Sequence, residues 1–362
     1  MSEERSKICI VTTRNIFDAP CLAKYQSLID CPFDIIYWDR CGVTENCGAE
    51  NYFRFHKEIP MNAGKLQKLK AYFQFSRFVN RILAKSNYSR LIVFPTQMGW
   101  LIQKKLSKRY KGRYIFDIRD YAGENNPLIS RMTKKVISNA GLCSITSPAY
   151  KKFLPKGEYL VSHNVQPIAG ELVERYRARV RDVKNPIVLS FIGTVRFIEQ
   201  QKKLIKLFKN DMRFHLKYIG RGSEQLDEFC KSEQVSNVTL IGRFDRERLP
   251  EFYMDTDMAI NVYGNHDPYL DYALSNKLYS AATMGMPILV SPGTYMAELV
   301  EKYGIGIAVH DDSNETPDVV YSFCNNLISS QLFERCDSFM KKVSEQENKY
   351  SNDVVNFLKN CC

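Results

Sequence analysis

Several common ligand-binding patterns are missing from this sequence of 362 residues. The loop after the first predicted strand, residues 7–13, lacks the GxGxxG pattern of a dinucleotide-binding domain, which argues against a Rossmann-type cofactor site there. The eleven cysteines include no CxxC pair, so no usual zinc spacing is present and we expect reduced thiols. No apolar run approaches the ~18–20 residues of a membrane span. The start MSEERSK carries two acids and runs into a strand, from which we expect no signal peptide.

Acidic residues are absent from residues 65–113, a stretch that holds 13 Lys and Arg. The first 164 residues hold 27 basic against 13 acidic residues, and the rest of the chain holds 24 against 27. A solvated helix usually mixes its charges, so this imbalance predicts a polyanionic partner: an anionic bilayer, a pyrophosphate-bearing acceptor or nucleic acid. Because no nucleic-acid-binding module is recognisable, we expect no nucleic acid.

Strands and helices alternate along the whole chain, and the length leaves room for two domains. Alternation of this kind is typical of parallel sheets in an α/β protein. We expect a first domain over residues 1–165, a linker over 166–186 that contains Gln166-Pro167 and Asn185-Pro186, and a second domain over 187–339.

Residues 65–85 predict a long amphipathic helix in which basic residues fill most of the remaining positions. Its apolar residues recur in steps of three and four: Leu66, Leu69, Tyr72, Phe73, Phe75, Val79, Ile82 and Leu83. Docking on a sheet accounts for this pattern, and so does a helix at a bilayer surface. The sequence leaves both interpretations open.

Residues 271–292 predict a loop, a short helix and a buried strand. Ser275 or Asn276 can cap the helix, Lys277 lies in its first turn, and Gly285 ends it before the strand that starts at Ile288. A helix start with free N–H groups and a lysine is suited to an anion. Ordinary packing of a helix on a sheet accounts for the same pattern.

The run NKLYSAATMGMPILV, residues 276–290, resembles the donor-site motif of group 1-type GT-B glycosyltransferases, which runs close to NKLFEYMAAGKPVI. Asn276, Lys277, Gly285 and Pro287 match, whereas Ser280 stands where the motif has the glutamate that holds ribose hydroxyls. The resemblance implies the GT-B fold, with two Rossmann-like βαβ domains facing across a cleft. It also implies a nucleotide-sugar in the second domain, and a last helix, about 340–362, that packs back on the first.

Further donor-binding residues follow from the resemblance. GTVRFIEQ, residues 193–200, is similar to the first loop of the donor domain, in which an Arg or Lys contacts the leaving diphosphate. The donor-side residues implied are Gly193, Thr194, Arg196, Arg243, Phe244, Ser275, Asn276, Lys277, Ser280 and Glu298. The alternative interpretation is that Arg196 is a surface arginine and that Arg243 and Phe244 are ordinary turn residues.

The acceptor side would lie in the first domain. Asp117-Ile118-Arg119-Asp120 follows a predicted strand and resembles the loop that closes the acceptor side of many such enzymes. Asp120 is the candidate base if the reaction inverts configuration, and Arg14, Asp117, Arg119 and His163 complete the acceptor-side set. A salt bridge at a strand end and a hydrogen-bonded structural histidine are the alternative interpretations.

The resemblance implies a metal-independent glycosyltransferase that moves a sugar from a nucleotide-diphosphate donor, with UDP preferred, to a saccharide acceptor. Helix N–H groups, Arg196 and Lys277 would stabilise the charge on the leaving diphosphate, with no cofactor and no metal. The aspartates at 255, 257, 311 and 312 are in contexts that look structural.

The acceptor is expected to be linked to polyprenyl pyrophosphate during capsule or O-antigen (lipopolysaccharide) synthesis. The protein is then expected to be cytoplasmic and peripheral at the inner membrane face. Two alternatives remain: a nucleotide-sugar epimerase with GT-B architecture, and a non-catalytic partner subunit of a glycosyltransferase, which the serine at position 280 suggests.

Overall fold

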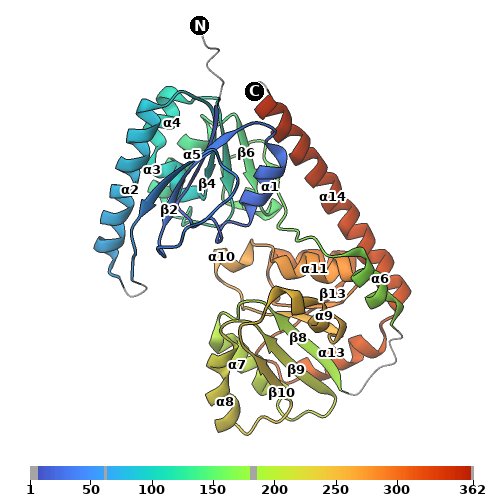
Figure 1. Cartoon of the computed structure of the whole chain (residues 1–362). Coiled ribbons are helices and arrows are strands. Elements are labelled where there is room, and N and C mark those ends of the chain that lie inside the picture. The colour runs from blue at the N-terminus through green and yellow to red at the C-terminus, as the bar shows by residue number, and fades with distance from the viewer. Residues whose placement is uncertain (1–6, 61–62, 180–185, 360–362) are drawn as a thin grey trace. The chain divides into compact units, whose positions relative to one another are not determined.

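The computed structural model describes residues 7–60, 63–179 and 186–359. Contacts between residues divide the chain into two compact units (Figure 1). Unit 1 comprises Met1–His163 and Glu345–Cys362, and unit 2 comprises Asn164–Ser344. The last helix runs from Ser329 to Lys359, so its final turns belong to unit 1.

Unit 1 contains a seven-stranded sheet in the order β3-β2-β1-β4-β5-β6-β7, and every neighbouring pair is parallel. The strands are β1 (Lys7–Thr12), β2 (Phe33–Asp39), β3 (Asn51–His56), β4 (Tyr88–Phe94), β5 (Tyr114–Ile118), β6 (Leu142–Ile145) and β7 (Leu160–Val161). The helices are α1 (Cys21–Leu28), α2 (Lys65–Lys85), α3 (Thr96–Leu101), α4 (Gln103–Arg109), α5 (Pro127–Ile137) and the 3-10 helix η1 (Pro148–Lys152).

Helices cover both faces of this sheet, which is why its central strands are buried along their length. On one face, Tyr25 of α1 and Tyr350 of α14 (Ser329–Lys359) belong to the same core as Ile10 of β1. On the other face, Phe75 of α2 packs against Trp38 of β2, with ring centroids 5.3 Å apart. The chain leaves each strand at the carboxyl end of the sheet through a connecting segment.

Unit 2 contains a six-stranded parallel sheet in the order β10-β9-β8-β11-β12-β13. Numbered within the unit, this is the order 3-2-1-4-5-6 of a Rossmann domain. The strands are β8 (Ile187–Ile192), β9 (Phe214–Ile219), β10 (Val238–Ile241), β11 (Met258–Asn261), β12 (Ile288–Val290) and β13 (Gly306–Ala308). The helices are α6 (Gly170–Ala178), α7 (Ile198–Leu207), η2 (Ser223–Leu226), α8 (Asp227–Ser232), η3 (Arg246–Arg248), α9 (Leu249–Met254), α10 (Pro268–Asp271), α11 (Asn276–Met284), α12 (Tyr295–Tyr303) and α13 (Thr316–Asn325).

The helix predicted over 65–85 is present as α2 with the same bounds, but only part of its predicted apolar set docks on the sheet. Phe75, Val79 and Leu83 are buried. Leu66, Leu69 and Phe73 instead point to solvent, with exposed fractions of 83%, 67% and 62%. The helix therefore carries apolar side chains on two sides. No helix of the described residues is long and apolar enough to cross a bilayer.

The basic stretch that ends at residue 110 forms two short helices, α3 and α4, because Ile102 between them has non-helical backbone angles of φ −117° and ψ 16°. The expectation of reduced thiols is wrong at Cys31, which is disulfide-bonded. Most of the other described cysteines are buried.

Candidate functional site

Ligands of doubly wound α/β domains bind at the carboxyl ends of the strands, where the strand order reverses. In unit 2 that reversal lies between β8 and β11, which are paired in the sheet. The chain after β8 continues through Gly193, and the chain after β11 continues through Tyr263. The topology of the sheet therefore brings the predicted Gly193 loop to the point at which a ligand is expected.

The Lys277 side chain lies beside the carboxyl ends of β8 and β11. Its Nζ donates a hydrogen bond to the Tyr263 hydroxyl at 2.7 Å and lies 4.1 Å from the centre of the Phe191 ring. A Cβ placed on Gly193 would lie 3.9 Å from the same Nζ, so the backbone of the Gly193 turn runs alongside the ammonium. Lys277, predicted from the motif, and Gly193, predicted from the first loop, therefore meet.

The ammonium of Lys277 has a neutral hydroxyl and aromatic rings for neighbours. Among the described residues it forms no ion pair with a carboxylate. Removal from water, together with the positive charge of Arg196, lowers the pKa of Lys277 from 10.5 to about 7. A partly buried cation with no anion beside it is a position where a bound anion would be stabilised.

The helix α11 places Lys277 by local sequence. Ser275, one of the two predicted caps, caps it by accepting a hydrogen bond from the Lys277 backbone N–H at 3.3 Å. Gly285 ends the helix, as predicted, and adopts the left-handed conformation with φ 73°. Leu278 and Met284 are buried, so packing against the sheet fixes the helix and the direction of its first turn.

Two glycine turns pack backbone against backbone beside Lys277. The N–H of Gly193 donates to Ile219 O at 2.8 Å, and Val195 N–H donates to Arg221 O at 2.9 Å. A Cβ on Gly220 would lie 2.1 Å from Gly193 O, and Gly220 has φ 135°. Only glycine fits where two backbones approach this closely.

We expect Gly220→Ala to destabilise unit 2 for two reasons. The added methyl group would collide with the Gly193 carbonyl, and alanine is strained at the positive φ of this position. The expected loss is about 3 kcal/mol of unfolding free energy. Urea unfolding followed by circular dichroism measures it. Gly242→Ala, at a glycine with open space around its Cβ position, is the matched control and should change stability little.

Arg196 belongs to the same group. It follows Val195 directly, and the next residue, Phe197, stacks edge-on against Tyr263 with ring centroids 5.4 Å apart. Arg196 is exposed, and its charge contributes to the lowered pKa of Lys277. Thr194 is exposed on the same turn. Arg196, on the loop after β8, and Lys277, in the first turn of α11, therefore both lie near Tyr263.

Ser280 does not offer a surface to a ligand. It is 8% exposed in the middle of α11. Burial raises the pKa of Tyr253 in α9, and a hydrogen bond with Ser280 opposes this shift. Where the resembling motif has a long acid, this chain has a short packing residue, so the prediction that Ser280 contacts the donor gains no support.

The remaining donor-side candidates are dispersed. Arg243 is exposed after β10, and Phe244 packs edge-on against Phe252 with ring centroids 4.9 Å apart. Asn276 is exposed at the start of α11. Glu298 is exposed in the first turn of α12. Among the described residues, neither Arg243 nor Phe244 contacts Lys277.

In unit 1 two acceptor-side candidates form a pair at the carboxyl edge of the sheet. Arg14 follows β1 and Asp120 follows β5, and their side chains form an ion pair at 3.1 Å. The Arg14 side chain is 41% exposed and that of Asp120 is 35% exposed. An accessible carboxylate held by an arginine at a strand end is able to accept a proton from a hydroxyl group.

The side chains of the other three acceptor-side candidates are bonded to neighbouring protein groups. Asp117 is fully buried, accepts a hydrogen bond from the Ser144 hydroxyl at 2.9 Å and pairs with Arg119 at 2.8 Å. His163 is 3% exposed and contacts Gln346 of α14 through Nε2 at 2.8 Å. Burial lowers its pKa, which favours the neutral ring. An acceptor-binding role for these residues gains no support.

Sequence reasoning missed three residues that lie near the carboxyl ends of the strands, two in unit 2 and one in unit 1. Phe191 and Tyr263 form the surroundings of Lys277, and aromatic residues at the ends of two adjacent parallel strands were the available signal. Glu124 lies in the loop after Asp120 and is 4% exposed. Its Oε2 accepts a hydrogen bond from Ala122 N–H at 2.7 Å, its Oε1 has no partner among the described residues, and burial raises the pKa of this carboxyl group.

Asp255 and Asp257, two of the aspartates considered for a metal, have other partners. Asp257 pairs with Arg179 at 3.0 Å and accepts from Val188 N–H at 2.9 Å, and Asp255 pairs with Lys217. These contacts agree with the structural interpretation of the Asp255-x-Asp257 run. Over the residues that the structure describes, no group of three or more His, Cys, Asp or Glu is placed to hold a metal ion.

Comparison with solved structures identifies the architecture. HepE from Anabaena, solved with UDP, superposes with a TM-score of 0.67 at 11% identity over 97% of this chain and 100% of that chain. Sucrose-phosphate synthase from Thermosynechococcus elongatus gives 0.64 at 13% identity over 97% and 99%. WaaG, a glycosyltransferase involved in lipopolysaccharide biosynthesis, gives 0.57 at 12% identity over 98% and 98%.

The chain has the GT-B fold. Its two parallel sheets, of seven and six strands, are the Rossmann-like domains that the sequence predicted. No family model matches the sequence, and no curated protein does. At these identities the likeness establishes the fold and leaves the activity to the site itself.

Proposed function

We propose that this GT-B protein is a glycosyltransferase that uses a nucleotide-diphosphate sugar. The observation that carries the proposal is Lys277, a cation without a carboxylate partner in the described residues, held beside the Gly193 backbone at the strand-order reversal of unit 2. Arg196 adds a second positive charge near Lys277. Two cations and a glycine turn at this position suit a diphosphate.

These groups supply what sugar transfer requires. As the bond from the sugar to the diphosphate breaks, the sugar carbon becomes positive and the leaving phosphate gains negative charge. Arg196 and Lys277, fixed before the reaction, would stabilise that charge. In an inverting reaction Asp120, held by Arg14, would take the proton from the attacking acceptor hydroxyl, and the products are the glycosylated acceptor and the nucleoside diphosphate.

The nucleotide is proposed to be UDP. HepE, a structural neighbour across the whole chain, was solved with UDP, with UDP and glucose, and with UDP-glucose. The acceptor is proposed to be a saccharide linked to polyprenyl pyrophosphate, in capsule or O-antigen synthesis. The 13 basic residues and no acids within 65–113 support a cytoplasmic protein that binds peripherally at the anionic inner membrane face.

A thermal-shift panel of UDP, GDP and ADP tests the proposal. We expect UDP to raise the melting temperature, and Lys277→Ala and Arg196→Ala each to reduce that shift by more than half. Lys302→Ala is the matched control, because Lys302 also lies over an aromatic ring, Tyr303, but is exposed on α12. Absence of a shift with all three nucleotides would count against the proposal.

The serine at position 280 favours one further candidate, a non-catalytic partner subunit that binds nucleotide without turning it over. Release of UDP from a UDP-sugar in the presence of a saccharide acceptor separates the two, since only the transferase couples release to glycosylation. An epimerase would convert the sugar and leave the acceptor unmodified, so analysis of the acceptor by mass spectrometry identifies it.

We also expect the reaction to need no divalent metal. Arg196 and Lys277 supply the positive charge that a metal ion would otherwise bring to the diphosphate. Transfer rates should therefore change less than about twofold after treatment with EDTA. A loss of activity that added Mg²⁺ or Mn²⁺ restores would show that the two cations are insufficient.

A further inference from the structure

We propose that Leu66, Leu69 and Phe73 of α2 form a ridge that inserts into an anionic lipid bilayer. This inference deepens the proposed function, on which it rests for its biological purpose, by naming the surface that meets the membrane. These three residues are called the α2 ridge below.

The α2 ridge is exposed although the rest of the helix is well packed. Its side chains are 83%, 67% and 62% exposed, in the order Leu66, Leu69 and Phe73. They are spaced by three and four residues, so they lie along one side of the helix. Ala71, Phe75, Val79 and Leu83 fill the opposite side and are completely buried. The ridge is therefore not needed for docking α2 on its sheet.

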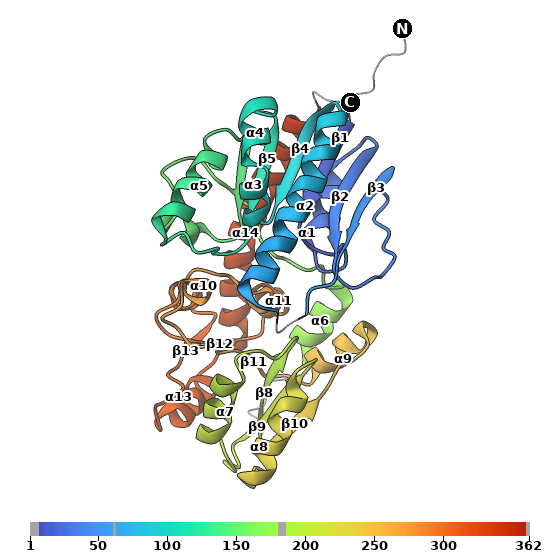
Figure 2. The same cartoon turned by 90° about the vertical axis from the view of Figure 1, so that its left-hand side faces the viewer.

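Nothing in the described part of unit 1 covers this side of the helix. Figure 2 shows α2 in front of the sheet, with no other helix of unit 1 over its outer side. Three large apolar side chains in successive turns at the surface are unusual for a protein that stays in water, and they mark an interaction surface.

The charges around the α2 ridge favour a bilayer as its binding partner. Lys65, Lys68 and Lys70 are exposed beside the ridge, and the guanidinium of Arg77, one turn further along, lies 6.0 Å from the centre of the Phe73 ring. No acid occurs anywhere in 65–113. Apolar side chains surrounded by cations without any acid are the pattern of a helix that lies in the surface of an anionic membrane.

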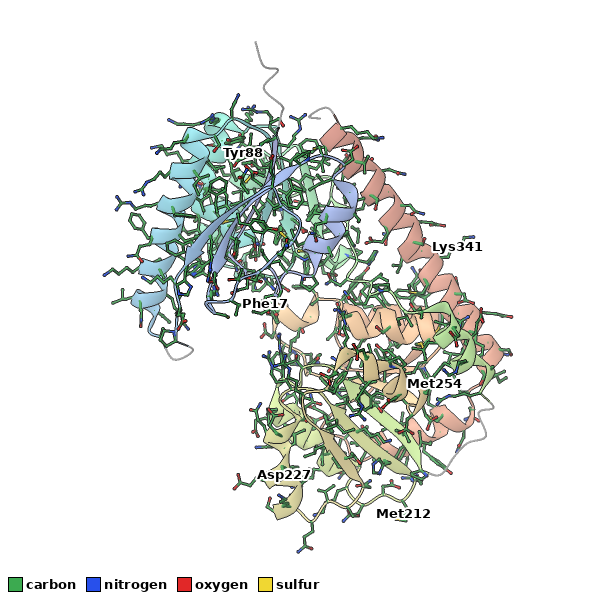
Figure 3. All side chains as sticks on the ribbon, viewed as in Figure 1. Phe17, Tyr88, Met212, Asp227, Met254 and Lys341 are labelled. Carbon is green, nitrogen blue, oxygen red and sulfur yellow. The ribbon has the colours of Figure 1, made fainter. Side chains whose placement is uncertain are left out.

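The position of α2 fits a membrane-bound acceptor. α2 follows the parallel strand β3, so its first turns lie at the carboxyl edge of the sheet, the edge that also holds Arg14 and Asp120. The loop after β1 adds Phe17, labelled in Figure 3, which is 57% exposed. A ridge held in the bilayer would keep this edge close to the headgroup of a lipid-linked saccharide.

Vesicle flotation tests the inference on the full-length protein. We expect binding to vesicles of phosphatidylcholine with phosphatidylglycerol and little binding to phosphatidylcholine alone. The triple variant Leu66→Ser, Leu69→Ser, Phe73→Ser should lose on the order of tenfold in partition coefficient. The control triple Met212→Ser, Val319→Ser, Ile328→Ser removes exposed apolar side chains from unit 2 and should bind as the unchanged protein does.

A tryptophan placed in the ridge reports insertion directly. Fluorescence of Phe73→Trp should shift to the blue with the anionic vesicles, whereas that of Met212→Trp should not (Met212 is labelled in Figure 3). Equal binding of the ridge triple and the control, or no shift at Phe73→Trp, would overturn the inference. So would a concentration-dependent dimer in light scattering that the ridge triple abolishes, since the ridge would then bind a second copy of the chain.

Failure of this inference can be told apart from failure of the proposed function. The ridge triple changes only unit 1, so its thermal shift with UDP should equal that of the unchanged protein. A normal UDP shift with unchanged vesicle binding would leave the transferase proposal standing and remove the ridge. A missing UDP shift in every variant would count against the proposed donor site whatever the vesicles show.

Discussion

Replacing Lys277 by methionine should make the free protein more stable at pH 6. The ammonium lies against Phe191 and Tyr263 without a carboxylate partner in the described residues, and its desolvation costs free energy in the folded state. Methionine keeps most of the side-chain length and removes the charge. After allowance for partial exposure and for the lost hydrogen bond to Tyr263, we expect a gain of about 2 kcal/mol in unfolding free energy.

The pH dependence of this gain has a definite sign. The pKa of Lys277 is about 7 in the folded protein and near its ordinary 10.5 when unfolded. Between these values the unfolded chain binds more protons, so the cost is full below pH 7 and is relieved as the pH rises toward 10.5. The stability of Lys277→Met relative to the unchanged protein should therefore be largest at pH 6 and shrink by pH 10.

Denaturant unfolding at pH 6 and pH 10 measures both effects. Lys302→Met, at the exposed lysine of α12, serves as the control and should show no pH-dependent gain. If Lys277→Met were less stable than the unchanged protein at pH 6, the lysine would be a structural residue. The interpretation of Lys277 as an uncompensated cation that awaits a ligand would then be wrong.

Asp120→Asn should lower the rate of sugar transfer on the order of 10²- to 10⁴-fold, which is the usual contribution of a general base. The amide keeps the size of the side chain and a hydrogen-bond acceptor for Arg14, but it cannot take a proton. Donor binding should be unchanged, because the donor groups lie in unit 2. Steady-state kinetics and the UDP thermal shift of the same variant separate the two effects.

Asp18→Asn is the control for this variant. Asp18 is exposed in the loop after β1. Its replacement removes one negative charge from unit 1, as Asp120→Asn does, but leaves the Asp120 carboxylate unchanged. Its transfer rate should stay within about twofold of that of the unchanged protein. An Asp120→Asn variant that turned over at a comparable rate would remove Asp120 as the base and the inverting mechanism with it.

Local signals predicted the fold and the helix α11 well. The Ser275 cap, the left-handed Gly285 and the buried strand after it depend on residues a few positions apart, and all three appear in the structure. Alternation of strands and helices predicted the two parallel sheets for the same reason. The Gly193 turn could also be predicted, although its backbone contact with Gly220 joins two strands and could not.

Side chains whose surroundings come from distant segments were harder to predict. Lys277 meets Phe191 and Tyr263 only because β8 and β11 are neighbours in the sheet. Asp117 and His163 resemble site residues in sequence but are buried by β6 and α14. On α2, periodicity identified apolar positions without showing that Leu66 and its neighbours face away from the sheet.

The central claim is that unit 2 holds a diphosphate through Lys277. Isothermal titration of UDP and of UMP, with the unchanged protein and with Lys277→Met, tests it most directly, because the two ligands differ by one phosphate. We expect the unchanged protein to bind UDP at least about 30-fold more tightly than UMP, and Lys277→Met to lose most of that preference. A variant that kept the full preference for UDP, or an unchanged protein without one, would contradict the account.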